Sequence, residues 1–384
     1  YKLEIGFAHR TFAWGSDARG KAHVHVVIIG LSRRDMEPAE KRLFSYDDIN
    51  GDPIETHHAM LSPYLFDASH LQSRHLVVGE VSRPLCAAPK MIIGSKPIDG
   101  GYLILDKDEK SDLLKKEPQA KKFIHPFVGG VEYLQGRERW ILALQKATPA
   151  ELRSMPEVAE RLKAVKEYRL GKRPAKKKQE SEVKSPGVSA KALANTPAEF
   201  HVTVIPDSPF LAVPENSSET REYLPIGWLK PPVIPSNKLR FTKNADLWHF
   251  GVLTSAIHIA WLRYIGGKIK SDFQYGIGIV YNTFPWPDAT EAQKKKIREL
   301  AQTILDTRAK YPQATLADLY DPDLMKADLR KAHHNLDLAV DRLYRAKPFG
   351  GDRDRVEHLF GLYERLVTPL ALAAKPAKSA RKKS

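Results

Sequence analysis

Cysteine is almost absent from this sequence of 384 residues, since Cys86 is the only one. A single thiol cannot form an intramolecular disulfide or supply a multi-cysteine metal site, so both kinds of scaffold are excluded. Long apolar runs are absent too, because none approaches the roughly 18 to 20 residues that cross a membrane. An integral membrane protein is therefore excluded, and no membrane partner is expected. With 42% hydrophobic residues, the chain can still bury at least one core.

Motifs for catalysis and cofactor binding are equally scarce. The sequence has no Walker A loop, no G-x-G-x-x-G and no H-E-x-x-H. Gly276-Ile-Gly278 has only two glycines and predicts a turn beside an apolar strand. The adjacent pairs His57-His58 and His333-His334 favour surface residues over metal ligands, because neighbouring side chains point in different directions. We therefore expect no catalytic residue, metal site or cofactor site within this chain.

One segment is similar to a catalytic loop without matching it. Asn282-Thr-Phe-Pro285-Trp286 is similar to the Asn-Pro-Pro-aromatic loop of amino-methyltransferases, but a threonine follows the asparagine and the prolines are spaced apart. The catalytic loop needs a sharp, proline-held turn that presents its asparagine to an exocyclic amine. We expect this segment to end a strand and to start a helical region instead.

Acidic residues are fewer than basic ones, with 46 Asp and Glu against 61 Lys and Arg, for a formal net charge of +15. The excess is concentrated in residues 161–184, with ten Lys or Arg and three Glu, and in residues 375–383, with five Lys or Arg. A basic protein suits a polyanion such as nucleic acid, but the remainder here is near neutral, so charge alone identifies no partner. The start at Tyr1, without an initiator Met or a signal peptide, predicts a cytoplasmic protein and favours part of a longer one.

Apolar periodicity predicts an α+β protein. Residues 2–30 predict a loop followed by a buried strand at 24–29, the last piece of a sheet whose other strands lie upstream. Residues 62–152 mix short apolar runs with turns, and helices are expected at 110–116 and from Glu157 onward.

The second half is predicted to become progressively helical. A flexible basic loop is expected at about 171–196, followed by a β-rich stretch at 200–241. A single helix at 246–265 and a glycine-punctuated loop at 266–278 come next. From there, apolar residues at i, i+3, i+4 and i+7 predict helices through the last third of the chain.

Several sequence blocks stand in a defined order along nearly the whole chain. They are Phe7-Ala-His-Arg-Thr-Phe-Ala-Trp14 with Gly20-Lys-Ala-His-Val-His-Val-Val-Ile-Ile-Gly30, Arg83-Pro-Leu-Cys86 with Pro89-Lys-Met-Ile-Ile-Gly-Ser95, Lys270-Ser-Asp-Phe-Gln-Tyr275, Ile279-Val-Tyr-Asn-Thr-Phe-Pro-Trp-Pro287, Leu319-Tyr-Asp-Pro322 and Arg355-Val-Glu-His-Leu-Phe360. Together they resemble the C-terminal half of the MmeI-like (type IIL) restriction-modification family of bacterial adenine DNA methyltransferases.

The resemblance implies an order of parts. In that family a nuclease, a helical spacer and an S-adenosylmethionine-binding methyltransferase core precede a target recognition domain and a helical C-terminal region. Residues 1–45 would end a truncated methyltransferase core, with a remnant edge of its α/β sheet. Residues 46–288 would form a mixed α/β target recognition domain, 289–370 a small helical bundle, and 371–384 a basic tail. The cofactor motif and the catalytic loop would lie upstream, so this chain alone is expected to be inactive.

The resemblance also suggests where a target base would rest. Methylation of a base amine requires the base to leave the stack and lie between aromatic or apolar faces. The aromatic residues before Gly20 resemble the family's last methyltransferase motif, and Trp14, followed by Phe12, is the expected stacking residue. The alternative is that both are core aromatics at a sheet edge.

Base edges are read by side chains on loops, with Arg or Lys suited to guanine and Asn or Gln to adenine. Three loops qualify by composition: the first is 214–221, the second 235–238 and the third 268–274. In the resembling family the residues that set specificity lie in about these places. The expected base-reading residues are Lys268, Lys270, Asp272, Gln274, Ser236, Asn237, Lys238, Glu215 and Asn216. The four in residues 268–274 alternate, so they would face one way if that segment were extended. The alternative is that these residues are ordinary solvated side chains of polar loops and do not read bases.

Phosphate contacts position a protein on DNA without reading sequence. The expected contacts are Arg10, Arg19, Lys21, Arg221, Arg240 and Lys243. The basic run at 172–178 would either follow the DNA backbone or only solubilise the chain.

The sequence thus predicts a sequence-specific double-stranded DNA recognition module of an adenine-N6 methyltransferase or restriction-modification enzyme. S-adenosylmethionine would be the cofactor of the parent enzyme, and the upstream methyltransferase domain of the same chain would be a partner. The main alternative is a general RNA- or single-strand-binding protein without sequence preference. A hydrolase or lyase of unrecognised type and a helical scaffold for other subunits also stay open.

Overall fold

The computed structural model describes residues 2–14, 24–176 and 187–373. Its first elements form a four-stranded sheet in the order β2-β1-β3-β4. These strands are β1 (Leu3–Trp14), β2 (Val24–Arg33), β3 (Lys41–Ser45) and β4 (Ile54–His58), and a helical turn, η1 (Arg34–Met36), follows β2. β1 and β2 pair antiparallel as a long hairpin, whereas β1 and β3 pair parallel. Ala8, Leu43 and Leu61 form the small core beneath this sheet.

Two expectations for this segment are wrong. Residues 3–14, expected as a loop, form β1, and irregular pairing between Ile5 and Phe7 and between His9 and Phe12 disrupts the two-residue alternation that marks a strand in sequence. β2 was expected to be buried, yet Val27, Ile29 and Leu31 are 47%, 47% and 58% exposed. β2 is the edge strand of the sheet, and the described elements leave both of its faces largely uncovered.

A separate lobe is built on a sheet in the order β12-β7-β8-β6. Its elements are β6 (Ile104–Leu105), α1 (Lys107–Lys116), η2 (Pro118–Phe123), β7 (Ile124–Val128), β8 (Trp140–Leu142), α3 (Pro149–Arg153), α4 (Pro156–Arg169), α5 (Val188–Ala192) and β12 (Ile234–Pro235). Helix α2 (Gly130–Gln135) connects β7 to β8 but packs outside the lobe, with Tyr133 in one core with Phe210 and Phe241. Asp106 and Glu109 form a capping box at the start of α1. At the start of α4, Glu117 accepts a hydrogen bond of 2.6 Å from the backbone N of Glu157. The helices expected near 110–116 and from Glu157 are therefore confirmed.

The expected flexible loop at 171–196 differs in part from the structure. Residues 188–192 form α5, with Ala190 buried, and residues 177–186 lie outside the described residues. The buried guanidinium of Arg169 fixes the end of this segment by donating to backbone carbonyl groups. Its acceptors are the carbonyl oxygens of Pro97, Ile98, Leu193, Thr196 and Glu199. One buried side chain thus joins α4 to two distant loops.

Two sheets form the centre of the molecule. The larger has the order β11-β9-β13-β5 and consists of β5 (Ile92–Ile93), β9 (Phe210–Pro214), β11 (Gly227–Leu229) and β13 (Leu239–Thr242). The smaller has the order β10-β15-β14 and consists of β10 (Asn216–Ser217), β14 (Gly267–Ile269) and β15 (Asp272–Gln274). Every residue of β9 and β13 is buried, so the larger sheet is a rigid base for the loops at its end.

The remaining elements are helical and enclose the largest core. They are α6 (Leu247–Thr254), α7 (Ala256–Ile265), η3 (Ile277–Tyr281), α8 (Glu291–Ala309), α9 (Leu316–Leu319), α10 (Ala327–Tyr344) and α11 (Asp352–Ala373). Phe250, Trp261, Leu336 and Phe360 are fully buried in this core. Mixed α/β structure followed by a helical C-terminal region confirms the expected α+β fold.

Three expectations in this region are wrong. The single helix expected at 246–265 is two helices, because Ser255 is extended and Asp337 of α10 caps α7 by accepting from the backbone N of Ala256 at 2.7 Å. The expected strand before Asn282 is the helical turn η3, and the Asn282 amide donates to the Val81 carbonyl at 2.8 Å. His333, expected at the surface, is fully buried against Tyr320.

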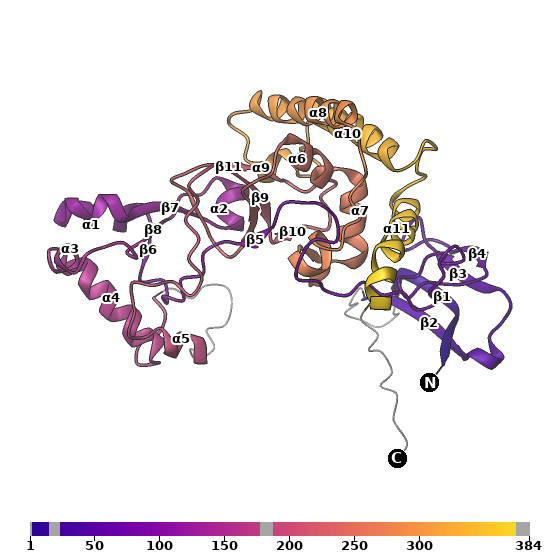
Figure 1. Cartoon of the computed structure of the whole chain (residues 1–384), viewed down its shortest axis with the longest axis horizontal. Helices are drawn as coiled ribbons and strands as arrows, with labels where there is room; N and C mark the ends of the chain where they lie inside the picture. Colours follow the sequence, from indigo (N-terminus) through magenta and orange to yellow (C-terminus); the bar gives the residue numbers. More distant parts are fainter. Residues whose placement is uncertain (1, 15–23, 177–186, 374–384) are drawn as a thin grey trace, which may run out of the picture.

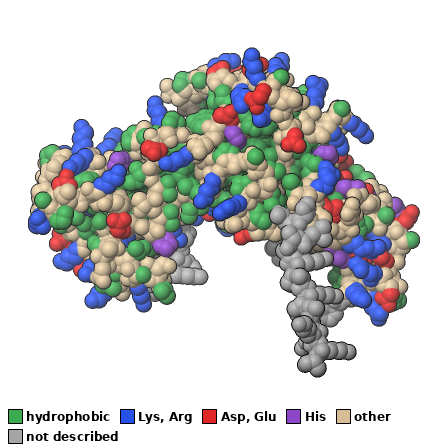
Figure 2. Space-filling model, in the orientation of Figure 1, with side chains coloured by type: hydrophobic (Ala, Val, Ile, Leu, Met, Phe, Trp, Pro, Cys, Tyr) green, Lys and Arg blue, Asp and Glu red, His purple; other side chains and the backbone are tan. Residues whose placement is uncertain are grey.

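The outline of the molecule is an arch (Figure 1). The lobe with α1, α3, α4 and α5 forms one end, and the sheet β1–β4 forms the other. Helices α8 and α10 lie along the outer side, whereas β5 and β10 lie toward the hollow between the two ends. Figure 2 shows the same hollow in the molecular surface, with Lys and Arg side chains spread over all parts of the arch.

Candidate nucleic-acid interface

The three loops selected from sequence meet in the structure. β10 pairs with β15 through Asn216 and Gln274, which joins the first loop to the third. The backbone N of Tyr275 also donates to the Glu215 carbonyl at 2.7 Å. The second loop is joined by a bond of 3.1 Å from the Glu215 backbone N to the Lys238 carbonyl. We call this surface, formed by residues 215–217, 236–238 and 267–274, the three-loop cluster.

The third loop is a hairpin, so its polar residues do not all face one way. Lys268 lies opposite Phe273 in the β14–β15 pair, and Ile269 lies opposite Asp272. Directly opposed residues share a face, and successive residues alternate. Lys268 is therefore on the face of Phe273, whose ring its ammonium approaches at 5.3 Å, while Asp272 and Gln274 are on the other face. Lys270 lies in the turn with φ of 57°. Residues 268–274 therefore do not form one extended segment, and their four polar side chains do not share one face.

The side chain of Glu215 is held inside the cluster. Its Oε1 accepts from Arg240 at 2.7 Å, and its Oε2 lies 3.0 Å from Lys238 Nζ. Burial opposes ionisation of this carboxyl, but the charges of Arg240 and Lys238 and their hydrogen bonds outweigh it, so the pKa of Glu215 is lowered. Glu215 is thus an ionised, paired group.

The other members of the cluster differ in exposure. Asn216, Lys268, Lys270 and Asp272 are exposed, as is Lys238, while Asn237 and Gln274 are partly buried. Ser236 is 3% exposed and bridges to Ser95 of the preceding segment. The exposed and partly buried side chains include donors and acceptors of the kinds that meet base edges.

The two aromatic residues expected to stack on a base lie near the end of β1. Trp14 is 54% exposed, with its ring centroid 6.0 Å from that of Phe12. Phe12 stacks on Tyr46 at 5.1 Å, and His9 stacks on Phe44 at 4.1 Å. Phe12 is therefore partly enclosed by its neighbours, whereas Trp14 presents an open aromatic surface.

Several expected phosphate contacts already have partners within the protein. Arg10 donates to the Tyr264 hydroxyl, and Lys243 pairs with Asp207 at 3.0 Å. Arg221 is partly buried, and Arg240 is 8% exposed. Arg19 and Lys21 lie outside the described residues. None of these observations tests DNA contact, so the assignment of these residues stays a prediction.

Lys96 is a cation beside the cluster that sequence reasoning missed. It is exposed, and in the described part of the chain it has no ion pair. Ser95 donates its backbone N to Pro235 at 2.7 Å, and Asn237 donates to the Ser95 carbonyl at 2.9 Å, so Lys96 directly adjoins the second loop. The sequence signal for Lys96 is its position immediately after the block Pro89 to Ser95.

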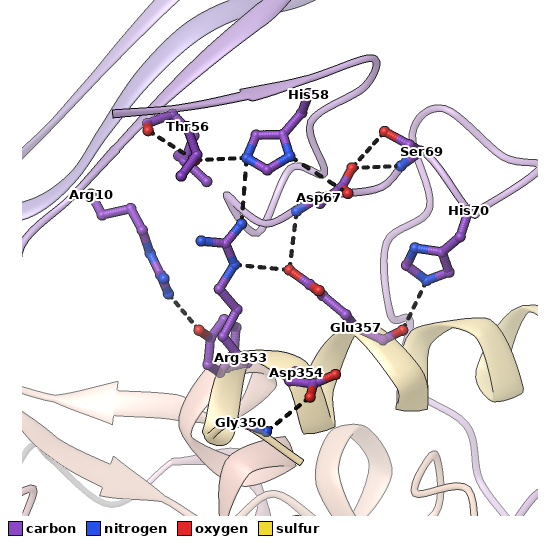
Figure 3. A network of polar contacts seen from close by, with 12 residues as sticks. Arg10, Thr56, His58, Asp67, Ser69, His70, Gly350, Arg353, Asp354 and Glu357 are labelled. Atoms are coloured by element: carbon purple, nitrogen blue, oxygen red, sulfur yellow. Dashed lines mark hydrogen bonds and ion pairs between the residues drawn. The ribbon is translucent and has the colours of Figure 1, made fainter. Parts of the chain in front are cut away.

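A polar network joins the N-terminal sheet to helix α11 (Figure 3). His58 of β4 contacts Arg353 at 3.5 Å and Asp67 at 3.5 Å, and Arg353 pairs with Glu357 at 2.8 Å. Glu357 in turn accepts from the Asp67 backbone N at 3.3 Å. The adjacent cavity of about 380 Å³ is lined by His58, Asp67, Gly350, Gly351, Arg353, Asp354 and Glu357. These bonds fix the position of the N-terminal sheet against the C-terminal helix.

The residues that the structure describes meet neither the requirements of a metal site nor those of a membrane-spanning helix. Among residues 2–14, 24–176 and 187–373, no group of three or more His, Cys, Asp or Glu is placed to hold a metal ion. Within the same ranges, no helix combines the length and apolar character needed to cross a membrane.

Three family models match three parts of the chain, in the order methyltransferase, target recognition and C-terminal domain. Residues 1–45 match the model described as MmeI, DNA-methyltransferase domain. Residues 72–288 match MmeI, target recognition domain, and residues 289–371 match MmeI, C-terminal domain.

Individual relatives agree with these models. The chain is 32% identical over 367 residues to DNA methyltransferase A of Bacillus subtilis (strain 168), which covers 96% of this chain and 39% of that protein. It is also similar to a solved structure of the type IIL restriction-modification enzyme MmeI in complex with DNA, with a TM-score of 0.81 and 37% identity. That match covers 95% of this chain and 46% of the other. The chain thus spans less than half the length of either relative.

Proposed function

The chain belongs to the MmeI family, with its target recognition domain at residues 72–288, and on this premise we propose that it is the part of an adenine-N6 DNA methyltransferase or restriction-modification enzyme that reads duplex sequence. The observation that carries the proposal is the convergence of three separate loops into the three-loop cluster. Their rigid base is a sheet whose central strands are fully buried. Base readout requires such rigidly held polar side chains.

The duplex would lie on the hollow side of the arch, between the lobe and the N-terminal sheet (Figure 2). There the exposed members of the three-loop cluster would meet base edges, and Lys96 would contact the phosphate backbone. Trp14 would provide the surface on which the target base stacks after leaving the helix, because it is the more exposed of the two aromatic residues. In this arrangement one end of the arch binds the target base while the centre reads the neighbouring sequence.

Methyl transfer belongs to the parent protein. S-adenosylmethionine is the cofactor that the methyltransferase family implies, and it supplies the methyl group. The described residues that match this domain, 2–14 and 24–45, contain β1, β2, β3 and η1 but no strand, glycine turn and helix of the kind that holds nucleotide cofactors. They do not fit the cofactor, so we propose that this chain alone is inactive.

The rest of the methyltransferase domain is the proposed partner of the N-terminal sheet. Val27, Ile29 and Leu31 lie on one face of β2 and are about half exposed. Apolar side chains in such a row are typical of a surface that packs against another element. We propose that the parts are residues 1–45, 46–288 and 289–370 with the tail 371–384, where strand β4 at 54–58 belongs to the N-terminal sheet and precedes the residues 72–288 that match the target recognition model. We also propose that the parent protein acts in the cytoplasm, where bacterial DNA lies.

Selection of bound duplexes from a randomised DNA library at physiological salt tests the proposed function. We expect one short motif to be enriched by the purified chain. Competition with single-stranded DNA and RNA provides the control. If single strands compete better than any duplex and no motif emerges while the protein is folded, the chain is a general single-strand binder and the proposal is wrong.

A further inference from the structure

Residues 81–96, which we call the connecting segment, carry charge of one sign only. Their sequence contains Arg83, Lys90 and Lys96 but no Asp or Glu. All three cationic side chains are exposed, and none of them forms a hydrogen bond or an ion pair in the part of the chain that the structure describes. The connecting segment therefore presents positive charge that is free to bind an anionic partner.

The first half of the connecting segment is fixed by hydrogen bonds to η3 and the residue that follows it. The Val81 backbone N donates to the Gly278 carbonyl at 3.1 Å, and the Val81 carbonyl accepts from the Asn282 amide at 2.8 Å. The Leu85 backbone N donates to the Asn282 carbonyl at 2.8 Å. Arg83 lies midway between these two anchor points, so its backbone is held in place while its side chain stays free.

The second half is fixed in the same way. The Tyr281 hydroxyl donates to the carbonyl of Pro89, directly before Lys90, at 2.6 Å. Strand β5 then pairs with β13, and the Lys96 backbone N donates to the Val202 carbonyl at 2.9 Å. Because the backbone is already ordered beside each cation, binding would cost little further conformational entropy in the main chain.

The connecting segment joins the two parts of the proposed DNA surface. Just before it, the Gly79 backbone N donates at 3.4 Å to the Tyr363 hydroxyl of α11, the helix to which the polar network joins the N-terminal sheet. At its other end, Ser95 bridges to Ser236 of the second loop. Strand β5, within the segment, lies toward the hollow of the arch (Figure 1). The three cations thus follow the path from the sheet that carries Trp14 to the three-loop cluster.

We propose that the connecting segment binds the phosphate backbone of duplex DNA, with Arg83 and Lys90 as contacts additional to Lys96. This inference rests on the proposed function and extends it from the three loops to the path between them and the N-terminal sheet. Phosphate is the favoured partner because the segment offers cations but no Asn, Gln, Asp or Glu, the side chains that read adenine and cytosine. Such contacts position the duplex and carry no sequence information.

Two double variants with the same net charge test the inference. Arg83→Gln combined with Lys90→Gln removes two charges from the connecting segment. Lys295→Gln combined with Lys331→Gln is the matched control, because both lysines are exposed, have no ion pair among the described residues, and belong to α8 and α10 on the outer side of the arch (Figure 1). Affinities for the selected duplex and a scrambled duplex are measured over a range of salt concentrations, and the thermal unfolding midpoint verifies folding.

We expect the variant of the connecting segment to reduce the slope of log affinity against log salt by about two, for both duplexes alike. Between about 50 mM and about 200 mM salt, the wild type should therefore lose about tenfold more affinity than this variant. The selected motif should stay the same, and the control should change the slope much less. Equal changes of slope in the two double variants, or an altered motif in the first, would overturn the inference.

Uncharged phosphates provide a second readout that does not depend on the salt slope. The selected duplex is synthesised with one methylphosphonate linkage at a time, which removes a single phosphate charge. At the contacted linkages the wild type should lose affinity while the variant of the connecting segment does not, because its phosphate contact is already gone. Equal sensitivity of both proteins at every linkage would overturn the inference.

The proposed function fails by a different result. A wild type that selects no motif, but shows the expected difference in salt slope on the scrambled duplex, would refute sequence reading and leave the phosphate contacts standing. A wild type that selects a motif, with equal slopes in both double variants, would refute the phosphate contacts and leave sequence reading standing.

Discussion

Asp337 makes the pH dependence of folding a test of the packing around α7. The residue is 5% exposed, and its two carboxyl oxygens accept from the Ala256 backbone N and the Tyr223 hydroxyl, each at 2.7 Å. Burial, the largest influence, raises the pKa of Asp337 from its usual 3.8 to about 7, although both hydrogen bonds favour the ionised form. The folded protein therefore keeps a proton that the unfolded chain loses at lower pH.

The sign and size of the effect follow from linkage. Protonated Asp337 contributes its full stability below about pH 4, and this contribution is lost as the pH rises through about 7. A shift of about three pKa units corresponds to about 4 kcal/mol over the whole titration, of which about 3 kcal/mol falls between pH 5 and pH 8. Asp337→Asn keeps an acceptor for Ala256 but cannot ionise, so this part of the pH dependence should vanish.

Urea unfolding at about pH 5 and about pH 8 measures the difference. We expect the wild type to lose about 3 kcal/mol more than Asp337→Asn between the two conditions. Glu299→Gln, which removes an exposed acid on α8, should leave the wild-type profile unchanged. Parallel profiles for the wild type and Asp337→Asn would refute the reasoning, because they would mean that Asp337 ionises as freely in the folded protein as in the unfolded chain.

Two further substitutions compare an arginine that holds the fold together with a lysine proposed to contact DNA. Arg169→Lys should lower the free energy of unfolding by about 3 kcal/mol, measured in urea, because one ammonium cannot satisfy five buried carbonyls; a loss under about 1 kcal/mol would contradict this. Lys96→Gln should reduce the slope of log affinity against log salt by about one while the selected motif stays the same, and an altered motif would mean that Lys96 reads bases instead.

Much of the fold can be predicted from the local periodicity of apolar residues. The apolar positions of α8 and α10 recur every three or four residues, and the capping box of α1 marks its start in sequence. Features that depend on distant partners could not be predicted in the same way. The break between α6 and α7 at Ser255 depends on Asp337, which lies on another helix. Strand β1 lacks a regular two-residue alternation in sequence because its pairing with β2 is irregular.

The candidate site was also only partly predictable from the sequence. Composition was enough to select three loops, because polar residues next to Gly and Pro are typical of binding loops. Composition could not distinguish Arg240 and Glu215 from charged residues at the surface, because a sequence alone does not show which charged side chains pair inside the protein. The structure shows that Arg240 is 8% exposed and that Glu215, within the cluster, is its ion-pair partner.

The central claim, that the three-loop cluster reads base pairs, is tested most directly by Gln274→Ala. Gln274 lies on β15 opposite Asn216, and an amide side chain can bond an adenine edge through two hydrogen bonds. Affinities would be measured for the selected duplex and for all its single base-pair changes. Gln302→Ala on α8 serves as the matched control.

The account predicts that Gln274→Ala loses preference at one base pair by about tenfold or more, with the other positions and the scrambled duplex unaffected. Gln302→Ala should change none of these values. Uniform weakening at every position, or an unchanged preference throughout, would contradict the claim that this cluster reads DNA sequence.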